Sequence, residues 1–176
     1  MSEDGVKEAT EETRELPDEA IRERIIELAF GGDRDRYEQF LEAIRRAIPL
    51  PVTVVLRGSA VTGVKWADGT PFDGKGPGTS DLDLTFVGKE MIQLYEDFYL
   101  PGLHSTPLSD EHPNAAPSLV PLRRALSSIA RRPVNIQATT SMVQYARDVL
   151  FDQPCFKLID DGEVEPAAAP TDARGD

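Results

Sequence analysis

Two stretches decide how the chain folds: Val52-Thr-Val-Val-Leu-Arg-Gly-Ser59 and Ser80-Asp-Leu-Asp-Leu-Thr-Phe-Val87. The first is a short β-branched run, typical of a buried strand, that ends in a Gly-Ser turn. In the second, side chains alternate between the two faces of a strand, so Asp81 and Asp83 point the same way, about 6.5–7 Å apart at Cα. The sequence therefore predicts two carboxylates side by side at one end of a strand.

This pair of carboxylates has a definite chemistry. Mg²⁺ prefers hard oxygen ligands and is commonly held by one or two carboxylates together with substrate oxygens and water. The Gly58-Ser59 turn supplies backbone N–H groups and a hydroxyl, and glycine lets a phosphate approach the chain closely. The plain alternative is that Asp81 and Asp83 are solvent-facing positions of a half-polar strand.

The charge is concentrated at the two ends of the chain. Of the net charge of −12, residues 1–19 contribute eight acids against two bases and residues 160–176 six acids against one, which leaves about −1 for residues 20–159. We expect disordered acidic tails at 1–17 and 161–176, and a single domain over 18–160, because 40 % apolar residues suffice for one core. The scattered basic residues predict no extended nucleic-acid-binding surface.

The sequence opens with no signal-like segment and has no long apolar run, so we expect a cytoplasmic protein that does not enter the membrane. Cys155 is the only cysteine, and its apolar surroundings indicate a buried strand residue. His104 and His112 flank a loop that also carries Asp110 and Glu111. A metal site there is conceivable, but solvated loop residues are the simpler interpretation.

Apolar periodicity and turn signals define the remaining elements. We expect helices at 18–30 and 33–48, a helical face over 91–99, a helix from Pro121 to 132, and a helix capped by Ser141; strands are expected at 52–56, 81–87, 133–139 and 155–159. Together they predict an α/β (α+β) fold, a mixed sheet flanked by helices with an N-terminal helical pair.

Residues 65–79 contain too many glycines and prolines to form a regular element. Two interpretations stay open. The loop can close over a bound nucleotide with Trp66 or Phe72 against the base, or it can be an exposed β-hairpin insertion.

Over residues 50–160 the chain resembles the nucleotidyltransferase superfamily, which includes DNA polymerase beta, kanamycin nucleotidyltransferase and the minimal bacterial nucleotidyltransferases. The resemblance rests on Gly58-Ser59, on Asp81-x-Asp83, and on the downstream run Arg132-Pro-Val-Asn-Ile, in that order. It implies a nucleotidyltransferase-like sheet, a triphosphate bound at Gly58 and Ser59, and Mg²⁺ (or Mn²⁺) bound by Asp81 and Asp83.

The resemblance implies an enzyme that moves a nucleoside monophosphate from an NTP to a hydroxyl acceptor and releases pyrophosphate. Arg57, Lys65 and Ser80 lie near the turn and the carboxylates, and we expect them to add nucleotide contacts. The acceptor is left open between a protein, a tRNA and a small molecule.

The chain departs from the family at the third carboxylate, whose position is taken by Asn135. A neutral amide can ligate a cation through its oxygen but cannot take a proton from the acceptor. Either Asp68, Asp73 or water handles that proton, or the protein is a catalytically degenerate module that binds a nucleotide or a partner protein without turnover.

Overall fold

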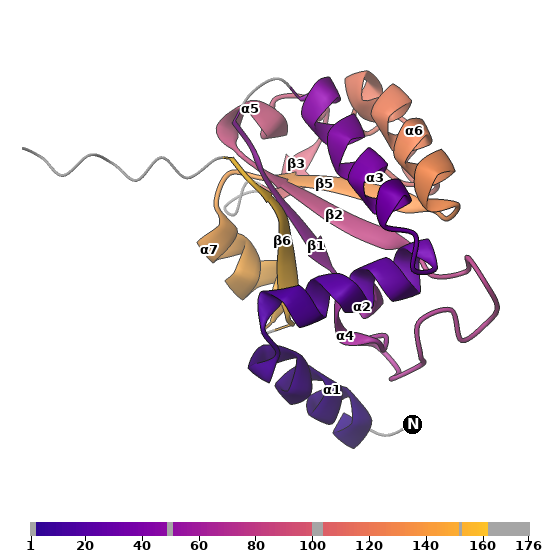
Figure 1. Ribbon diagram of the computed structural model, residues 1–176. Helices are drawn as coiled ribbons and strands as arrows, with labels where there is room; N and C mark the ends of the chain where they lie inside the picture. The colour runs from indigo at the N-terminus through magenta and orange to yellow at the C-terminus, as the bar shows by residue number, and fades with distance from the viewer. Residues whose placement is uncertain (1–2, 49–50, 100–103, 152, 162–176) are drawn as a thin grey trace, which may run out of the picture.

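The computed structural model describes residues 3–48, 51–99, 104–151 and 153–161 (Figure 1). Its helices are α1 (Glu3–Glu15), α2 (Asp18–Phe30), α3 (Arg34–Ala47), α4 (Ser59–Thr62), α5 (Lys89–Ile92), α6 (Val120–Ala130) and α7 (Met142–Tyr145), with the short turns η1 (Pro117–Leu119) and η2 (Ala146–Leu150). The strands are β1 (Thr53–Arg57), β2 (Leu82–Val87), β3 (Phe98–Tyr99), β4 (His104–Ser105), β5 (Val134–Thr139) and β6 (Cys155–Asp160).

The strands form one mixed sheet in the order β3-β4-β5-β2-β1-β6. β2 lies in its middle, antiparallel to β1 and parallel to β5. The register places Arg57 of β1 opposite Asp83 of β2, and Asp83 opposite Asn135 of β5. The pairing thus brings three residues that are distant in sequence into one row across the sheet.

The mixed α/β class and the N-terminal pair of helices were both predicted and are confirmed. Glycine ends α2 as expected, because Gly31 adopts the left-handed conformation (φ 65°) that side chains disfavour. Asp33 then caps α3 by accepting a hydrogen bond from the Arg36 amide at 3.0 Å. The predicted cap at Ser141 is present too, since its hydroxyl accepts from the Gln144 amide.

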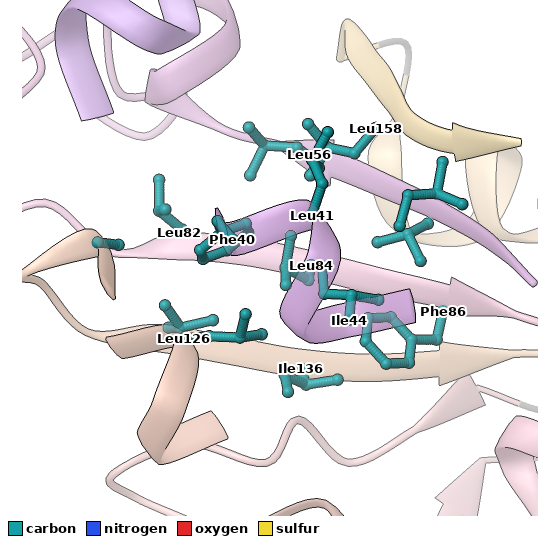
Figure 2. Packing of buried hydrophobic residues seen from close by; sticks show 14 of the residues in the cluster. Phe40, Leu41, Ile44, Leu56, Leu82, Leu84, Phe86, Leu126, Ile136 and Leu158 are labelled. Atoms are coloured by element: carbon teal, nitrogen blue, oxygen red, sulfur yellow. The ribbon is translucent and has the colours of Figure 1, made fainter. Parts of the chain in front are cut away.

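The apolar face of the sheet is covered by α3 and α6, which pack against each other (Figure 1). Phe40 and Ile44 of α3 and Leu126 of α6 meet the sheet residues that face them, namely Leu56, Leu82, Leu84, Phe86, Ile136 and Leu158 (Figure 2). Burying each such side chain contributes about 1.5–3 kcal/mol, so this layer holds β1, β2 and β5 in register.

The other face of the same strands is polar and still buried. Thr85 and Gln137 are at most 8 % exposed, and the Tyr145 hydroxyl lies between them. Thr85 donates to the Tyr145 hydroxyl at 2.8 Å, and Tyr145 donates to Gln137 Oε1 at 3.0 Å. Since the buried polar groups satisfy one another, this face is ordered without an apolar core.

The structure corrects two expectations about secondary structure. Residues 3–15, expected to lie in a disordered tail, form α1, whose Thr13 is buried and whose Glu12 pairs with Arg24 of α2 at 2.7 Å. The predicted helical face over 91–99 is only the one turn of α5 followed by β3, because Tyr95 is buried and donates to the Ile136 carbonyl at 2.6 Å. Residues 162–176 of the predicted C-terminal tail lie outside the described residues.

No helix within the described ranges is both long and apolar enough to cross a membrane.

Candidate metal and nucleotide site

The two aspartates of the Asp-x-Asp run converge on one side chain of the neighbouring strand. Asn135 donates from Nδ2 to Asp81 Oδ2 at 2.8 Å and to Asp83 Oδ1 at 3.0 Å. The structure therefore brings together the three residues for which the sequence predicted a shared site. It does so because β2 and β5 are parallel neighbours, so that their amino ends meet at one edge of the sheet.

Asp83 is the more buried of the two carboxylates. Burial raises the pKa of the Asp83 carboxyl above its usual value; Asp81 acts in the same direction, and Arg57 and the Asn135 amide oppose it. Asp81 is exposed. The site thus holds one exposed and one largely desolvated carboxylate, an arrangement that attracts a cation.

Arg57 lies beside this pair rather than out in solvent. It pairs across the sheet with Asp83, and its buried Nε has no hydrogen-bond partner within the described residues. Its charge also reaches Tyr145: burial raises the pKa of the Tyr145 hydroxyl, and Arg57 opposes that rise. Arg57 is therefore placed to balance Asp83 from the polar face, and it does not line the cleft in front of the carboxylates.

Gly58 and Ser59 form the turn into α4, as the sequence predicted. Gly58 has φ 84°, a conformation that side chains rarely adopt, and an added Cβ would lie 3.6 Å from Asp83 Oδ2. The turn therefore passes directly beside the carboxylates. Ser59 is 8 % exposed, which leaves little of its hydroxyl open to a ligand in this conformation.

A cleft of about 520 Å³ opens in front of the carboxylates. Asp81, Asp83 and Asn135 form one wall, and Lys65, predicted to contact the nucleotide, also lines it. The full lining is Lys65, Thr79, Asp81, Asp83, Pro107, Ser109, Asp110, Glu111, His112, Pro133 and Asn135. The volume falls in the range of small-molecule sites.

The opposite wall is the loop that carries Asp110, Glu111 and His112. It is fixed to β5 by Leu108, which exchanges backbone hydrogen bonds with Ile136 at 2.8 and 3.0 Å. No group of three His, Cys, Asp or Glu residues suited to a metal occurs in the described part of the chain, either in this loop or at Asp81 and Asp83. His104 is buried elsewhere, against Thr139 at 2.7 Å.

Ser80 does not belong to the cleft. It is 1 % exposed, its amide donates to Asp73 Oδ1 at 2.9 Å, and its hydroxyl accepts from the Asp73 amide at 2.8 Å. The predicted nucleotide contact at Ser80 is thus replaced by a structural role, because both of its polar groups are used to close the loop of residues 65–79.

Sequence reasoning missed the residue that organises this loop, Arg132. Its guanidinium donates to both oxygens of Asp73, at 3.0 and 3.2 Å, to the Ser80 carbonyl, and to the carbonyls of Leu28 and Ala29 at the end of α2. It also lies 4.6 Å from the Phe72 ring centroid. No local pattern signals these contacts, because the partners come from three separate segments.

The arrangement of the loop removes Phe72, but not the exposed Trp66, from the interpretation that residues 65–79 close over a nucleotide base. Phe72 is 8 % exposed and packs under Arg132, so it is not available to a nucleotide base. A bridge between Val64 and Pro71 gives the start of the loop a hairpin form, with Trp66 40 % exposed at its tip. The hairpin interpretation therefore describes residues 64–71, while Arg132 fixes the rest.

Comparison with known proteins adds no relative. No family model, no curated protein and no solved structure matches this chain.

The donor set fits a divalent cation. The Asn135 amide nitrogen, a hydrogen-bond donor, sits where the two carboxylates converge. Rotation of the amide by half a turn would present its oxygen instead, giving two carboxylates and one neutral oxygen. Such hard oxygen ligands suit Mg²⁺ or Mn²⁺.

Proposed function

We propose that this protein is a Mg²⁺-dependent nucleotidyltransferase that moves a nucleoside monophosphate from an NTP to a hydroxyl acceptor. One observation carries the proposal: Asp81, Asp83 and Asn135 converge at 2.8 and 3.0 Å at the mouth of a cleft, directly beside the Gly58 turn. In the superfamily that the sequence resembles, two aspartates and a Gly-Ser turn hold the metal and the triphosphate, with a third carboxylate at the position of Asn135.

In this mechanism Asp81 and Asp83 would hold the cation, with the Asn135 amide oxygen as a third ligand if the amide is rotated. When bound, the cation neutralises charge on the phosphates and stabilises the leaving pyrophosphate. Lys65 lies in the same cleft and adds a positive charge for the triphosphate. Arg57 favours the ionised form of Asp83, because its charge opposes the rise in pKa that burial causes.

The acceptor hydroxyl must lose a proton, and Asn135 cannot take it. Asp73 is also unsuited, since Arg132 and the amides of Gly78 and Ser80 occupy its carboxylate. Asp68 is used to close a turn onto the Thr70 amide at 2.8 Å and does not line the cleft. The groups within the cleft that can accept the proton are Glu111 and His112 on the opposite wall, besides water.

The second candidate function is a degenerate module that binds a nucleotide or a partner without turnover. The bridge from Asn135 to both carboxylates favours it, because the amide already satisfies them without a cation. Phosphoryl-type transfer depends mostly on positioning and charge neutralisation, so in the first candidate the loss of a carboxylate base slows the reaction without abolishing it. In the second candidate no transfer occurs.

Transfer of label from each α-labelled NTP, with Mg²⁺ or Mn²⁺ and a cell extract as the source of acceptor, tests the proposal. We expect metal-dependent labelling that disappears in Asp81→Asn/Asp83→Asn. The matched control is Asp161→Asn, an exposed acid at the opposite end of the sheet, which should label like the native chain.

No labelling by a folded native chain, with Mn²⁺-dependent NTP binding retained, would overturn the transferase and support the binding module. Loss of NTP binding as well would overturn both. Gain of labelling in Asn135→Asp, from a chain that otherwise binds only, would identify the missing carboxylate as the reason for inactivity.

A further inference from the structure

A second hollow, of about 430 Å³, adjoins the carboxylate cleft. The two share Asp110 and Pro133 as part of their walls. The hollow lies between the start of β5 and the exposed side of α6, and it is lined by Asp110, Arg123, Arg124, Ser127, Arg132 and Pro133. Three of its six lining residues are therefore arginines, in a chain whose net charge is −12.

Two of the three arginines are held in place. Arg123 donates from Nε to the Val134 carbonyl at 2.6 Å and from Nη2 to Asp110 Oδ1 at 2.7 Å, and its side chain is 14 % exposed. Arg132 is fixed by Asp73 and by backbone carbonyls, with 8 % of its side chain exposed. Guanidinium groups that are already ordered lose little freedom when they meet a ligand.

The third arginine, Arg124, is exposed and has no ion pair among the described residues. One carboxylate also lines the hollow, that of Asp110, but it is 81 % exposed and already paired with Arg123. The hollow thus keeps one uncompensated positive charge beside two ordered guanidinium groups. Arg124 and the unused N–H groups of Arg123 can donate to a phosphate group, whereas the five hydrogen bonds of Arg132 go to Asp73 and to backbone carbonyls.

The neighbouring cleft has the opposite character. Asp81, Asp83, Asp110 and Glu111 give it four acids against Lys65 and His112. Without a divalent cation the cleft repels anions, whereas the hollow attracts them. This separation of charge distinguishes two subsites at one entrance.

We infer that the arginine hollow binds a phosphate group of a second ligand, next to the cleft that takes the cation. That this ligand is the acceptor of the transfer reaction rests on the proposed function; the binding of phosphate does not. The acceptor is then a phosphate-bearing molecule whose hydroxyl reaches Asp81 and Asp83 from the side of α6.

Binding of tripolyphosphate in EDTA at low salt, followed by calorimetry, tests the hollow without any activity. We expect Arg124→Ala to weaken binding about fivefold, because one exposed charge contact is removed. The matched control is Arg45→Ala, an exposed arginine of α3 that also has no ion pair among the described residues, and it should bind like the native chain. Salt should weaken binding by the native chain more than by Arg124→Ala.

Three results would overturn the inference. These are no binding by the native chain, equal weakening by Arg124→Ala and Arg45→Ala, or a larger change on Asp81→Asn/Asp83→Asn than on Arg124→Ala, because binding that depends on relief of the carboxylate repulsion would place the anion in the cleft. AMP and adenosine serve as further probes. Binding of AMP but not of adenosine would show that a nucleotide can supply the phosphate. Binding of tripolyphosphate but not of AMP would limit the hollow to free polyphosphate.

The role as acceptor site is tested separately in the labelling assay. We expect Arg124→Ala to raise the acceptor concentration needed for half-maximal labelling while leaving that for NTP unchanged. An unchanged acceptor requirement would overturn this role alone. No labelling by the native chain would overturn the proposed function and, with it, the role as acceptor site, while the phosphate-binding result would stand by itself.

Discussion

Asp73 and Asp83 lie close in sequence, on either side of Ser80, yet the fold treats their carboxylates in opposite ways. Asp73 receives a guanidinium and two backbone amides. Although burial raises its pKa, the hydrogen bonds from Arg132, Gly78 and Ser80 outweigh this and hold the pKa below the usual value. Asp83 receives a neutral amide, and burial raises its pKa.

The difference separates a carboxylate used for stability from one kept for a ligand. Asp73 is satisfied inside the protein and closes a loop. Asp81 and Asp83 share a single amide nitrogen, so a cation from solution can improve on the contact that they already have. The chain therefore neutralises Asp73 with a hydrogen-bonded cation, Arg132, whereas Asp83 is balanced only by Arg57 across the sheet.

Removing the cation from the satisfied carboxylate should have the largest effect. We expect Arg132→Met to lower the free energy of unfolding by about 3 kcal/mol, because it leaves a partly buried carboxylate and several carbonyls without their donor. Chemical denaturation measures this. The control is Arg131→Met at the exposed neighbouring position, and equal losses in the two variants would contradict the distinction drawn here.

Adding a third carboxylate beside Asp81 and Asp83 should have the next largest effect on stability. We expect Asn135→Asp to lower the free energy of unfolding by about 2 kcal/mol in EDTA, since three carboxylates then converge and the bridging donor is lost. Mn²⁺ should restore much of this stability, because a cation that binds the folded state stabilises it. Thermal melts with and without Mn²⁺ provide the measurement, and a loss that Mn²⁺ leaves unchanged would argue against a cation at this point.

Neutralising the buried member of the pair should stabilise the fold. We expect Asp83→Asn to raise the free energy of unfolding by roughly 1 kcal/mol in EDTA, because it removes a desolvated carboxylate and its like-charge repulsion with Asp81. The same variant should lose Mn²⁺ binding measured by electron paramagnetic resonance. Asp161→Asn serves as the control, and destabilisation by Asp83→Asn would mean that the fold needs this charge.

The smallest expected effect is on the pH dependence of stability, to which Asp73 and Asp83 should contribute with opposite signs. The raised pKa of Asp83 makes the folded state bind a proton before the unfolded state does, so stability should rise as pH falls from 7 through that pKa toward the unfolded value of 3.8. The lowered pKa of Asp73 contributes stability above the unfolded value of 3.8 that is lost as pH falls below it. Asp83→Asn should abolish the rise, and denaturation at pH 7, 5 and 3 checks both signs.

Local sequence was sufficient to predict the row that forms the site. Alternation placed Asp81 and Asp83 on one face, and the Pro133–Thr139 run placed Asn135 on the polar face of its strand, away from Val134 and Ile136. The resemblance then indicated that the two strands are neighbours. Their parallel pairing with Asp83 opposite Asn135 is what the structure adds.

Contacts between distant segments could not be predicted. Ser80 is next to Asp81, and proximity in sequence suggested a shared role. Its hydroxyl and its amide instead bond to Asp73, which closes the loop. Arg132 belongs to the run that carries the resemblance and follows a helix, but neither fact indicated its contacts with Asp73, Ser80 and the end of α2. The many acids of α1 made it look like a disordered tail in the sequence. Its contacts with Arg24 of the next helix, through Glu12 and Thr13, could not be read from that composition.

The parallel pairing of β2 and β5 also makes the site a reporter of how the chain folds. Side chains alternate along a strand, so a slip of one residue between these strands would set Ile136 beside Asp83 and turn the Asn135 side chain to the other face. Residues 88–133 connect the two strands, so their pairing closes a long loop. Metal binding during refolding should therefore appear only with the final, correctly aligned sheet, and any earlier collapsed species with a shifted strand would remain silent.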